Sequence, residues 1–474
     1  MASSCTLIYQ VIVLCLCHIL SSGLWHNYAD ELIRKGESPE CKAKYEGTRN
    51  LTRLFDDNAR QGWRLWPGLL TQHEFETGES MYGFREAMEM LWKNQHPEDC
   101  SKAKFLIAEG WPQGFGSEVH VLGVGLAVAL KTNRVFMINP EGTPEHDFLN
   151  NTWQVQNKFC RGLGNKKSAL DCYFEPWTHC LPEHALQGKT IKELHVHQKT
   201  YFSDTDFQNK FDEVQATVKE VKTVLFESRG DAPESFPPVL EPILACSPVL
   251  QRKYWWRSVA AAYMMRPRPE TLALMDQYRS QIPFKNGQEQ CVSVYVRRGD
   301  KHVEMRPVHT DFYMETALTL WEAGLVPGPG GSGDAVSATL TGSVFLGSED
   351  PDVIDQALRW ANKTNWKVHY TKLFDRRNDV STGLDWVHQV KMKRKQQFKH
   401  HELEYFSMIL NIDYHLRCNA FVCTLPSNFC RLIDEMRATV AGKITRHYAE
   451  LGIAGCPPND NNKICLHSHF LNYF

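Results

Sequence analysis

Short apolar runs alternate with helix-forming segments along most of the chain, and this order predicts an α/β protein. The pattern is clearest in the second half, where apolar runs predict strands at residues 291–296, 343–347, 366–370 and 420–424. Helix-forming segments follow them at residues 311–322, 352–361, 402–416 and from residue 427 onward. Because strands and helices alternate, we expect a parallel, doubly wound sheet.

The first half carries a weaker version of the same pattern. Residues 83–92 have helical character, and residues 99–108 lead from a turn into a short strand. An apolar, helix-like run then ends at Leu130, and residues 134–138 predict a second strand. We therefore divide the chain into a helical stem (26–98), an N-terminal α/β domain (99–285) and a C-terminal Rossmann-like domain (286–474).

An apolar segment near the N-terminus points to the secretory pathway. Residues 6–20 are apolar apart from Gln10 and His18. This segment is shorter than the about 20 residues that a membrane-spanning helix needs, and it matches the apolar region of a signal peptide. No lysine or arginine precedes it, so a short signal anchor is the alternative. We assign residues 1–25 to one of these two segments, and we expect no other link to a membrane.

The cysteines and glycosylation sequons agree with a luminal location. Three of the 15 cysteines lie within residues 1–25, which leaves 12, an even number that suits disulfides in an oxidising compartment. Asn50, Asn150 and Asn362 each begin an Asn-x-Ser/Thr sequon and are candidate glycosylation sites. We expect the protein in the Golgi lumen, with secretion as the alternative.

Charge and spacing argue against three other kinds of site. A formal net charge of −2 offers no electrostatic case for binding nucleic acid. The Gly114-x-Gly116 and Gly123-x-Gly125 runs are not followed by a GK[ST] sequence, so neither is a P-loop. No CxxC pair has a matching second pair, so we expect no structural zinc site.

The strand predicted at residues 291–296 ends abruptly in the sequence Arg297-Arg298-Gly299-Asp300-Lys301. Ligands of open α/β sheets bind at the carboxyl ends of the strands. Two guanidinium groups there suit a diphosphate, because each offers a planar fork of donors. Asp300 and Lys301 could orient the arginines or a sugar hydroxyl. A solvated strand edge and an exposed Arg-Gly-Asp adhesion loop are the alternatives.

Two other predicted strands also end in polar residues, and a parallel sheet would bring all three ends to one edge. Ser427 and Asn428 follow the last predicted strand, where Ser427 would either bind a phosphate or cap a helix. Glu349 and Asp350 follow another, where they would bind sugar hydroxyls or begin a helix. Three further residues lie nearby in the sequence: Asn411 and Asp413, of which Asp413 could bind a base, and Glu304, the best candidate general base.

Taken together, several short sequences resemble those of a known family. They are Asp99–Lys104, Trp255-Trp256, Arg266–Pro269, Val296–Lys301, Phe312–Met314, Leu346–Pro351, Phe421–Thr424 and Ser427–Arg431. In this order they resemble the α1,6-fucosyltransferases of N-glycan processing, and more loosely the bacterial chitin-oligosaccharide and protein O-fucosyltransferases. The resemblance implies a GT-B-like α/β fold, in which two Rossmann-like domains flank a cleft. It also implies a GDP-fucose donor and inverting transfer to a glycan or glycoprotein, without a metal or other cofactor.

The resemblance also implies roles for individual residues. Arg297 would contact the diphosphate with support from Arg298, and Glu304 would be the base, with Lys301 also in the catalytic group. The donor site would further include Asp300, Tyr313, Glu349, Asp350 and Ser427. Cys423 and Cys430 would form a local disulfide.

The chain departs from the family at positions that bear on the donor. Tyr295 stands where the family usually has histidine, Asn411 where it has aspartate, and Asn428 where it has glutamine. The family's histidine and aspartate help to hold guanine, so these changes bear on donor identity, although Asp413 could compensate. We expect no counterpart of the family's C-terminal SH3-like domain or of its long stem. Two alternatives therefore stay open: a GT-B enzyme with another nucleotide-sugar donor, and an inactive glycan-binding relative.

Overall fold

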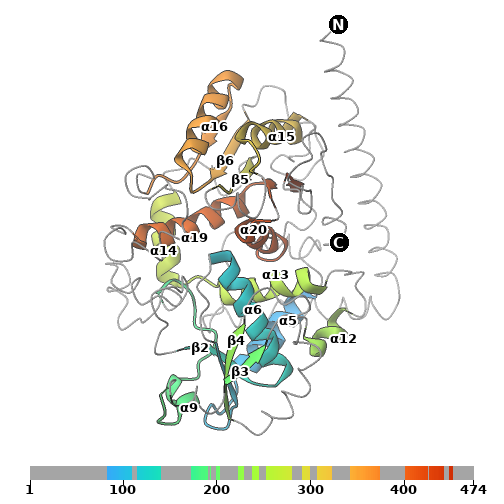
Figure 1. Ribbon diagram of the computed structural model, residues 1–474, viewed down its shortest axis with the longest axis vertical. Helices are drawn as coiled ribbons and strands as arrows, with labels where there is room; N and C mark the ends of the chain where they lie inside the picture. Colours follow the sequence, from blue (N-terminus) through green and yellow to red (C-terminus); the bar gives the residue numbers. More distant parts are fainter. Residues whose placement is uncertain are drawn as a thin grey trace.

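The computed structural model describes residues 83–108, 115–139, 172–190, 193, 199–202, 222–228, 237–244, 252–279, 291–298, 307–322, 342–373, 401–424, 426–441 and 448–451. These residues form an α/β structure with two parallel sheets (Figure 1). Several predictions fall outside the described residues: the segment 1–25, most of the stem, Asn50, Asn150, Asp300, Lys301 and Glu304.

The first sheet consists of β1 (Phe105–Ala108), β2 (Val135–Ile138), β3 (Lys199–Phe202) and β4 (Thr223–Ser228). All its pairs are parallel, in the order β2-β1-β4-β3. The sequence predicted β1 and β2, which are apolar runs. It did not predict β3 and β4, because short apolar runs alternate with charged residues in that part of the chain.

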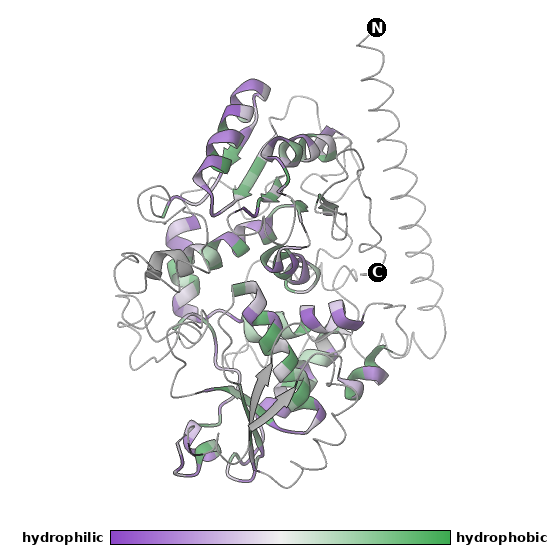
Figure 2. Cartoon of the chain, viewed as in Figure 1, coloured by the Kyte–Doolittle hydropathy of each residue, from purple (hydrophilic) through white to green (hydrophobic). Residues whose placement is uncertain are grey.

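The helices of this half are α5 (Phe84–Gln95), α6 (Phe115–Lys131), α9 (Pro182–Leu186), α12 (Glu241–Leu244), α13 (Arg252–Met264) and α14 (Pro269–Arg279), with a 3₁₀ turn η2 at Pro238–Leu240. Almost all of α6 is buried, as its apolar composition requires, and Figure 2 shows apolar residues along most of it. Proline at the first position of α14 suits a helix start, and it separates α14 from α13 as the sequence predicted.

The second sheet consists of β5 (Val292–Tyr295), β6 (Ser343–Gly347), β7 (Lys367–His369), β8 (Ala420–Cys423) and β9 (Tyr448–Glu450). Its order is β7-β6-β5-β8-β9, and every pair is parallel. The first four strands confirm the sequence prediction, whereas β9 was not predicted. The strand β5 occupies the centre of the sheet and is fully buried.

Among the described residues, four helices accompany these strands: α15 (Thr310–Glu322), α16 (Pro351–Thr364), α19 (His401–Arg417) and α20 (Asn428–Ala438). The helices α15 and α19 lie on opposite faces of the sheet. Val292 and Val294 share an apolar cluster with residues of α15, and Tyr295 and Phe421 share another with residues of α19. This alternation explains why the strand is apolar on both faces.

Three disulfides join described residues: Cys100–Cys180, Cys291–Cys418 and Cys423–Cys430. The last agrees with the pairing that the resemblance implies. Cys291 lies directly before β5 and Cys418 lies two residues before the neighbouring strand β8, with their Cα atoms 4.8 Å apart. This disulfide therefore ties together the amino ends of two central strands.

Helix packing connects the two sheets. The helix α20, which follows β8, packs against both α6 and α13 of the first half. One apolar cluster accordingly runs from α5, α6 and α13 to Phe345 and Phe421 of the second sheet. No helix within the described ranges has the length and apolarity needed to cross a bilayer.

Candidate functional site

Three polar strand ends meet at the carboxyl edge of the second sheet. The strands β6, β5 and β8 are neighbours and run parallel, so the residues that follow them lie side by side. This arrangement confirms the expectation that Arg297, Glu349 and Ser427 share one edge.

Glu349 is the centre of the hydrogen bonds at this edge. Its Oε1 accepts hydrogen bonds from Arg297 Nη1 and, at 2.8 Å, from the backbone N–H of Arg298. Its Oε2 accepts from the hydroxyl of Tyr295 at 3.4 Å. The sequence suggested a sugar ligand or a helix start for Glu349. Here the carboxylate instead organises the arginine pair.

The two arginines are held from several directions. Arg297 Nη1 also donates to the Arg298 carbonyl at 3.0 Å, and Arg298 Nη2 donates to Thr310 Oγ1 at 3.2 Å. Thr310 is the first residue of α15, so this helix and Glu349 together orient the pair. Both arginine side chains are half-buried at this edge of the sheet.

Three other predicted site residues have clear structural roles. Asp350 caps α16, because its carboxylate accepts from the backbone N–H of Asp352 at 2.8 Å. Ser427 caps α20 by accepting from the Cys430 N–H at 3.4 Å. Tyr313 was predicted to shape the donor site, but it is fully buried on α15 in the core cluster that includes Val294.

Asp413 lies in a buried ion-pair cluster. Its Oδ2 accepts from Arg279 Nε at 3.0 Å and from Arg417 Nε at 2.9 Å. Its Oδ1 accepts from Nη2 of Arg279 at 2.7 Å and from Nη2 of Arg417 at 3.2 Å. Burial alone would raise the pKa of Asp413, but the charges of Arg417 and Arg279 outweigh it and lower that pKa. Both carboxylate oxygens are engaged, so the compensating contact to a base that the sequence suggested is not available in this arrangement.

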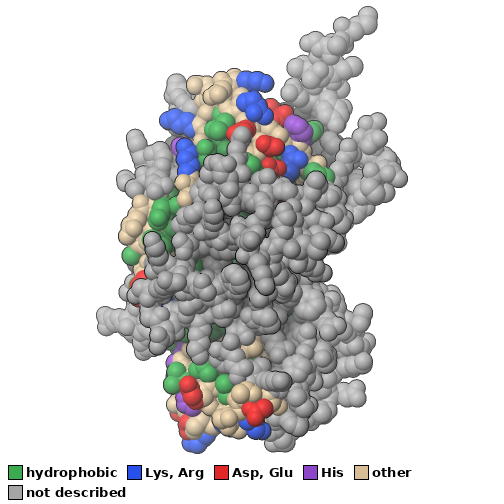
Figure 3. Space-filling model, turned by 60° about the vertical axis from the view of Figure 1, so that its left-hand side comes forward, with side chains coloured by type: hydrophobic (Ala, Val, Ile, Leu, Met, Phe, Trp, Pro, Cys, Tyr) green, Lys and Arg blue, Asp and Glu red, His purple; other side chains and the backbone are tan. Residues whose placement is uncertain are grey.

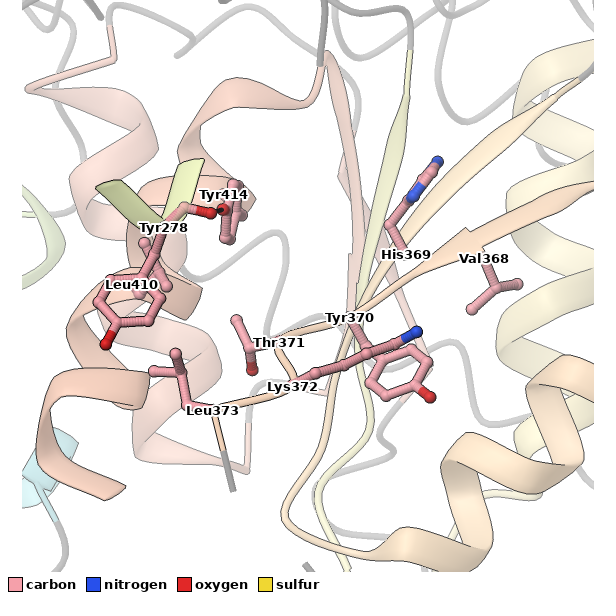
Figure 4. A pocket seen from close by; sticks show the side chains of 9 residues that line it. All are labelled: Tyr278, Val368, His369, Tyr370, Thr371, Lys372, Leu373, Leu410 and Tyr414. Atoms are coloured by element: carbon pink, nitrogen blue, oxygen red, sulfur yellow. Dashed lines mark hydrogen bonds between the residues drawn. The ribbon is translucent and has the colours of Figure 1, made fainter. Parts of the chain in front are cut away.

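A small cavity lies at the carboxyl end of β7, beside Asn411. It has a volume of about 90 Å³ and is lined by Tyr278, Val368, His369, Tyr370, Thr371, Lys372, Leu373, Leu410 and Tyr414. Figure 4 shows Tyr278, Leu410 and Tyr414 on one side and the chain after β7 on the other. Thr371 Oγ1 donates to Asn411 Oδ1 at 3.1 Å. The sequence offered no signal for these lining residues except that several follow a predicted strand.

The cavity and the arginine pair lie at the same edge of the sheet. Two strand spacings, or about 10 Å, separate β7 from β5, because neighbouring strands lie about 4.8 Å apart. The cavity is smaller than a typical ligand site of roughly 300–1,000 Å³. It could therefore accept one aromatic ring system of a longer ligand whose anionic part reaches the arginines.

The first sheet contributes the N-terminus of α6 to the same region. A Cβ atom added to Gly116 would lie 2.7 Å from the backbone carbonyl of Asn428, so the first turns of α6 and α20 touch. The helix α6 follows β1 and α20 follows β8. The carboxyl edges of the two sheets therefore face each other across this contact.

Two other features, the mixed surface charge and the potential metal ligands among the described residues, do not extend the arginine pair. Figure 3 shows side chains of both signs mixed over the described surface at the upper end of the molecule, where the second sheet lies. Within the described ranges, a single group of potential metal ligands comes together, formed by Cys100, His179 and Cys180. Its two cysteines form a disulfide, so they offer no thiolate to an ion.

Comparisons with known proteins found distant structural likenesses. No protein-family model and no curated protein sequence matches the chain. A mutant of Arabidopsis thaliana FUT1 in complex with GDP has a TM-score of 0.41 and 12% identity, over 80% of this chain and 79% of that one. The fucosyltransferase NodZ from Bradyrhizobium has a TM-score of 0.36 and 14% identity, over 70% and 92%. POFUT1 in complex with GDP has a TM-score of 0.33 and 17% identity, over 74% and 99%.

Proposed function

We propose that this protein is a glycosyltransferase that transfers fucose from GDP-fucose to a glycan or glycoprotein. The observation that carries the proposal is the arginine pair at the carboxyl end of the central strand β5, held in place by Glu349. Guanidinium groups in this position suit a diphosphate. The ordered set of short sequences from Asp99 to Arg431 supports the choice of a fucosyl donor.

The proposed architecture is of the GT-B type. Residues 99–285 would form one domain and residues 286–474 the other, with the donor bound to the second. The contact between Gly116 and Asn428 supports this arrangement, because it brings the carboxyl edges of the two sheets together. Substrates would then bind between these edges.

The donor would lie along the edge of the second sheet. Its diphosphate would contact Arg297 and Arg298, and its base would reach toward the cavity at the end of β7, where Asn411 is a neighbour. An amide recognises a base differently from a carboxylate, because it offers both a donor and an acceptor. Asn411 is therefore the residue to vary in a test of nucleotide choice.

The chemistry follows from the charge that develops on the departing GDP. The two arginines would stabilise that charge, a role that a metal ion has in other transferases. Glu304 lies six residues after Arg298 in the sequence and would remove the proton from the acceptor hydroxyl. Attack from the face opposite the leaving group would invert the anomeric carbon. Asp300 and Lys301 would complete the donor site.

Thermal unfolding of the purified full-length protein with nucleotides tests this function. GDP and GDP-fucose, without added metal, should raise the melting temperature, whereas UDP and ADP should not. A ligand at 100 times its Kd stabilises a protein by about 2.7 kcal/mol. Arg297→Ala should remove this response without changing the melting temperature of the free protein. Arg359→Ala, which alters an exposed arginine on α16, is the control and should retain the response.

The same experiment separates the alternatives. Equal stabilisation by GDP, UDP and ADP, or a preference for UDP, would indicate a GT-B enzyme with another nucleotide-sugar donor. Binding of GDP-fucose with neither hydrolysis nor transfer across an acceptor panel would indicate an inactive glycan-binding relative. Unchanged GDP binding in Arg297→Ala would refute the assignment of the diphosphate site.

A further inference from the structure

The first turns of α6 and α20 touch at one glycine. A Cβ atom added to Gly116 would lie 2.7 Å from the carbonyl carbon and oxygen of Asn428 and 2.8 Å from the backbone nitrogen of Phe429. Ordinary van der Waals contact begins at 3.4 Å. The three atoms belong to the backbone, so no change of rotamer can make room. Any side chain at residue 116 would therefore separate the two helices.

Space, and not backbone conformation, is what Gly116 provides. It is the second residue of α6 and is buried. Positive φ angles occur among the described glycines at Gly83 and Gly188, so the backbone of Gly116 is open to alanine. Alanine also forms helices more readily than glycine. The missing side chain therefore serves the contact with α20.

The first turn of α20 is held to the second sheet. The disulfide between Cys423 and Cys430 joins it to the end of β8, and the Ser427 N–H donates to the Thr424 carbonyl at 3.0 Å. Ser427 also caps the helix. The strand β8 pairs with β5, which ends at the arginine pair. A displacement at Gly116 would therefore fall on α6 and the first sheet.

Further contacts make this junction one packed unit. Asn428 Nδ2 donates to Ser117 Oγ, and His120 Nε2 lies 2.8 Å from Glu435 Oε2, with both of these side chains buried. Figure 1 shows α20 beside α6 and α13, and both helices pack against it. The separation of the helices at Gly116 therefore carries over to the sheets on either side.

We propose that Gly116 is a positioning residue, which sets the distance between the carboxyl edge of the first sheet and the arginine pair at the edge of the second. This inference rests on the proposed function, in which the substrates bind between these edges. Alanine would widen the contact from 2.7 Å to at least 3.4 Å, a displacement of about 0.7 Å. Reacting atoms must approach to about 3–3.5 Å, and a misplacement of about 1 Å can cost about a hundredfold in rate.

The kinetics of Gly116→Ala test the proposal. The kcat of fucosyl transfer should fall by about 10- to 100-fold. The rise in melting temperature with GDP should equal that of the wild type, because Arg297 and Arg298 follow β5 of the second sheet. Gly123→Ala is the control on the same helix, since its Cβ would meet the side chain of Ala260 at 3.3 Å and not a backbone atom. This control should keep the wild-type kcat.

The possible results separate positioning from other roles. A lower melting temperature of Gly116→Ala with unchanged kcat would indicate a merely structural role and would overturn the proposal. Loss of the GDP response together with kcat would place the damage in the donor site, which would overturn it as well. If the wild type neither responds to GDP nor transfers fucose, the proposed function itself fails.

Hydrogen exchange of the full-length wild-type protein tests the contact without a substrate or a variant, and so decides the case in which Gly116→Ala fails to fold. The first N–H groups of a helix have no partner within it, so tertiary contacts must protect them. After correction for intrinsic rates, the amides of residues 116–118 should exchange at least about tenfold more slowly than those of residues 311 and 312. The latter residues are exposed at the start of α15. Equal protection at both helix starts would show that α6 and α20 separate in solution, and would overturn the proposal.

Discussion

Replacement of His415 by leucine should make the protein more stable, and more so in acid. His415 is completely buried on α19, with the rings of Tyr295, Phe345 and Phe421 at centroid distances of 5.9, 4.9 and 5.7 Å. Neither ring nitrogen has a hydrogen-bond partner among the described residues. A buried polar group without a partner costs about 1–3 kcal/mol. Leucine would remove that cost at neutral pH.

The acid component follows from the pKa of the ring. Burial, and then the charge of Arg437, lowers the pKa of His415 from 6.5 to about 3. The unfolded state therefore takes up this proton first as the pH falls, and stability is lost from pH 6.5 downward toward pH 3. For these two values the loss at pH 5.5 is about 1.4 kcal/mol relative to pH 7.5. Leucine cannot take up a proton, so the variant avoids this loss.

Urea unfolding of both proteins at pH 7.5 and pH 5.5, followed by tryptophan fluorescence, measures the effect. The free energy of unfolding of His415→Leu, relative to that of the wild type, should rise by about 1.4 kcal/mol from pH 7.5 to pH 5.5. His96, whose pKa burial also lowers to about 3, titrates in both proteins and cancels in the difference. His309→Leu, at an exposed position on the chain before α15, is the control for replacing a histidine by leucine. A difference in free energy of unfolding between His415→Leu and the wild type that is equal at both pH values would refute this reasoning.

Three further changes test other parts of the structure. Asp413→Asn should lower the free energy of chemical unfolding at pH 7 by about 3–5 kcal/mol, because two partly buried arginines lose a fully buried counter-charge. Because the pKa of Asp413 is lowered, its contribution to wild-type stability is present at neutral pH and is lost only in strong acid. The difference in stability between the wild type and Asp413→Asn should therefore disappear in strong acid. Glu349→Gln should change the free energy of unfolding by less than about 1 kcal/mol. It should tighten GDP binding, because Arg297 loses a competing anion, and slow fucosyl transfer, because Arg297 loses the group that orients it. Calorimetry measures the first effect and the rate of transfer measures the second. Asn362→Gln should reduce the glycan-dependent shift on gels after expression in a secretory host, because Asn362 is exposed on α16. An unchanged shift would exclude glycosylation there.

Local features of the sequence were enough to predict most of the second half of the fold. The strand β5 is an apolar run that ends at two arginines, and α16 begins just after the capping residue Asp350. Such signals act over a few residues, so they can be read without the rest of the chain. The strands β3, β4 and β9 lack them. Tyr448–Glu450, for example, is a strand because it pairs with β8 at the edge of the sheet.

The candidate site was predictable in place but not in its contacts. The rule that parallel strands end at one edge correctly placed Arg297, Glu349 and Ser427 together. It could not show that Glu349 would bind Arg297, or that Tyr313 would turn into the core behind the sheet.

The sequence by itself therefore determined which segments form strands and helices and which edge collects the polar residues, because periodicity, caps and strand direction are local properties. Only the tertiary structure decided which partners meet. Asp413 binds Arg279, 134 residues away, and His120 binds Glu435, 315 residues away. A buried charge must find a partner or carry a large desolvation cost. Which partner it finds depends on how the helices pack, and that packing involves the whole chain at once.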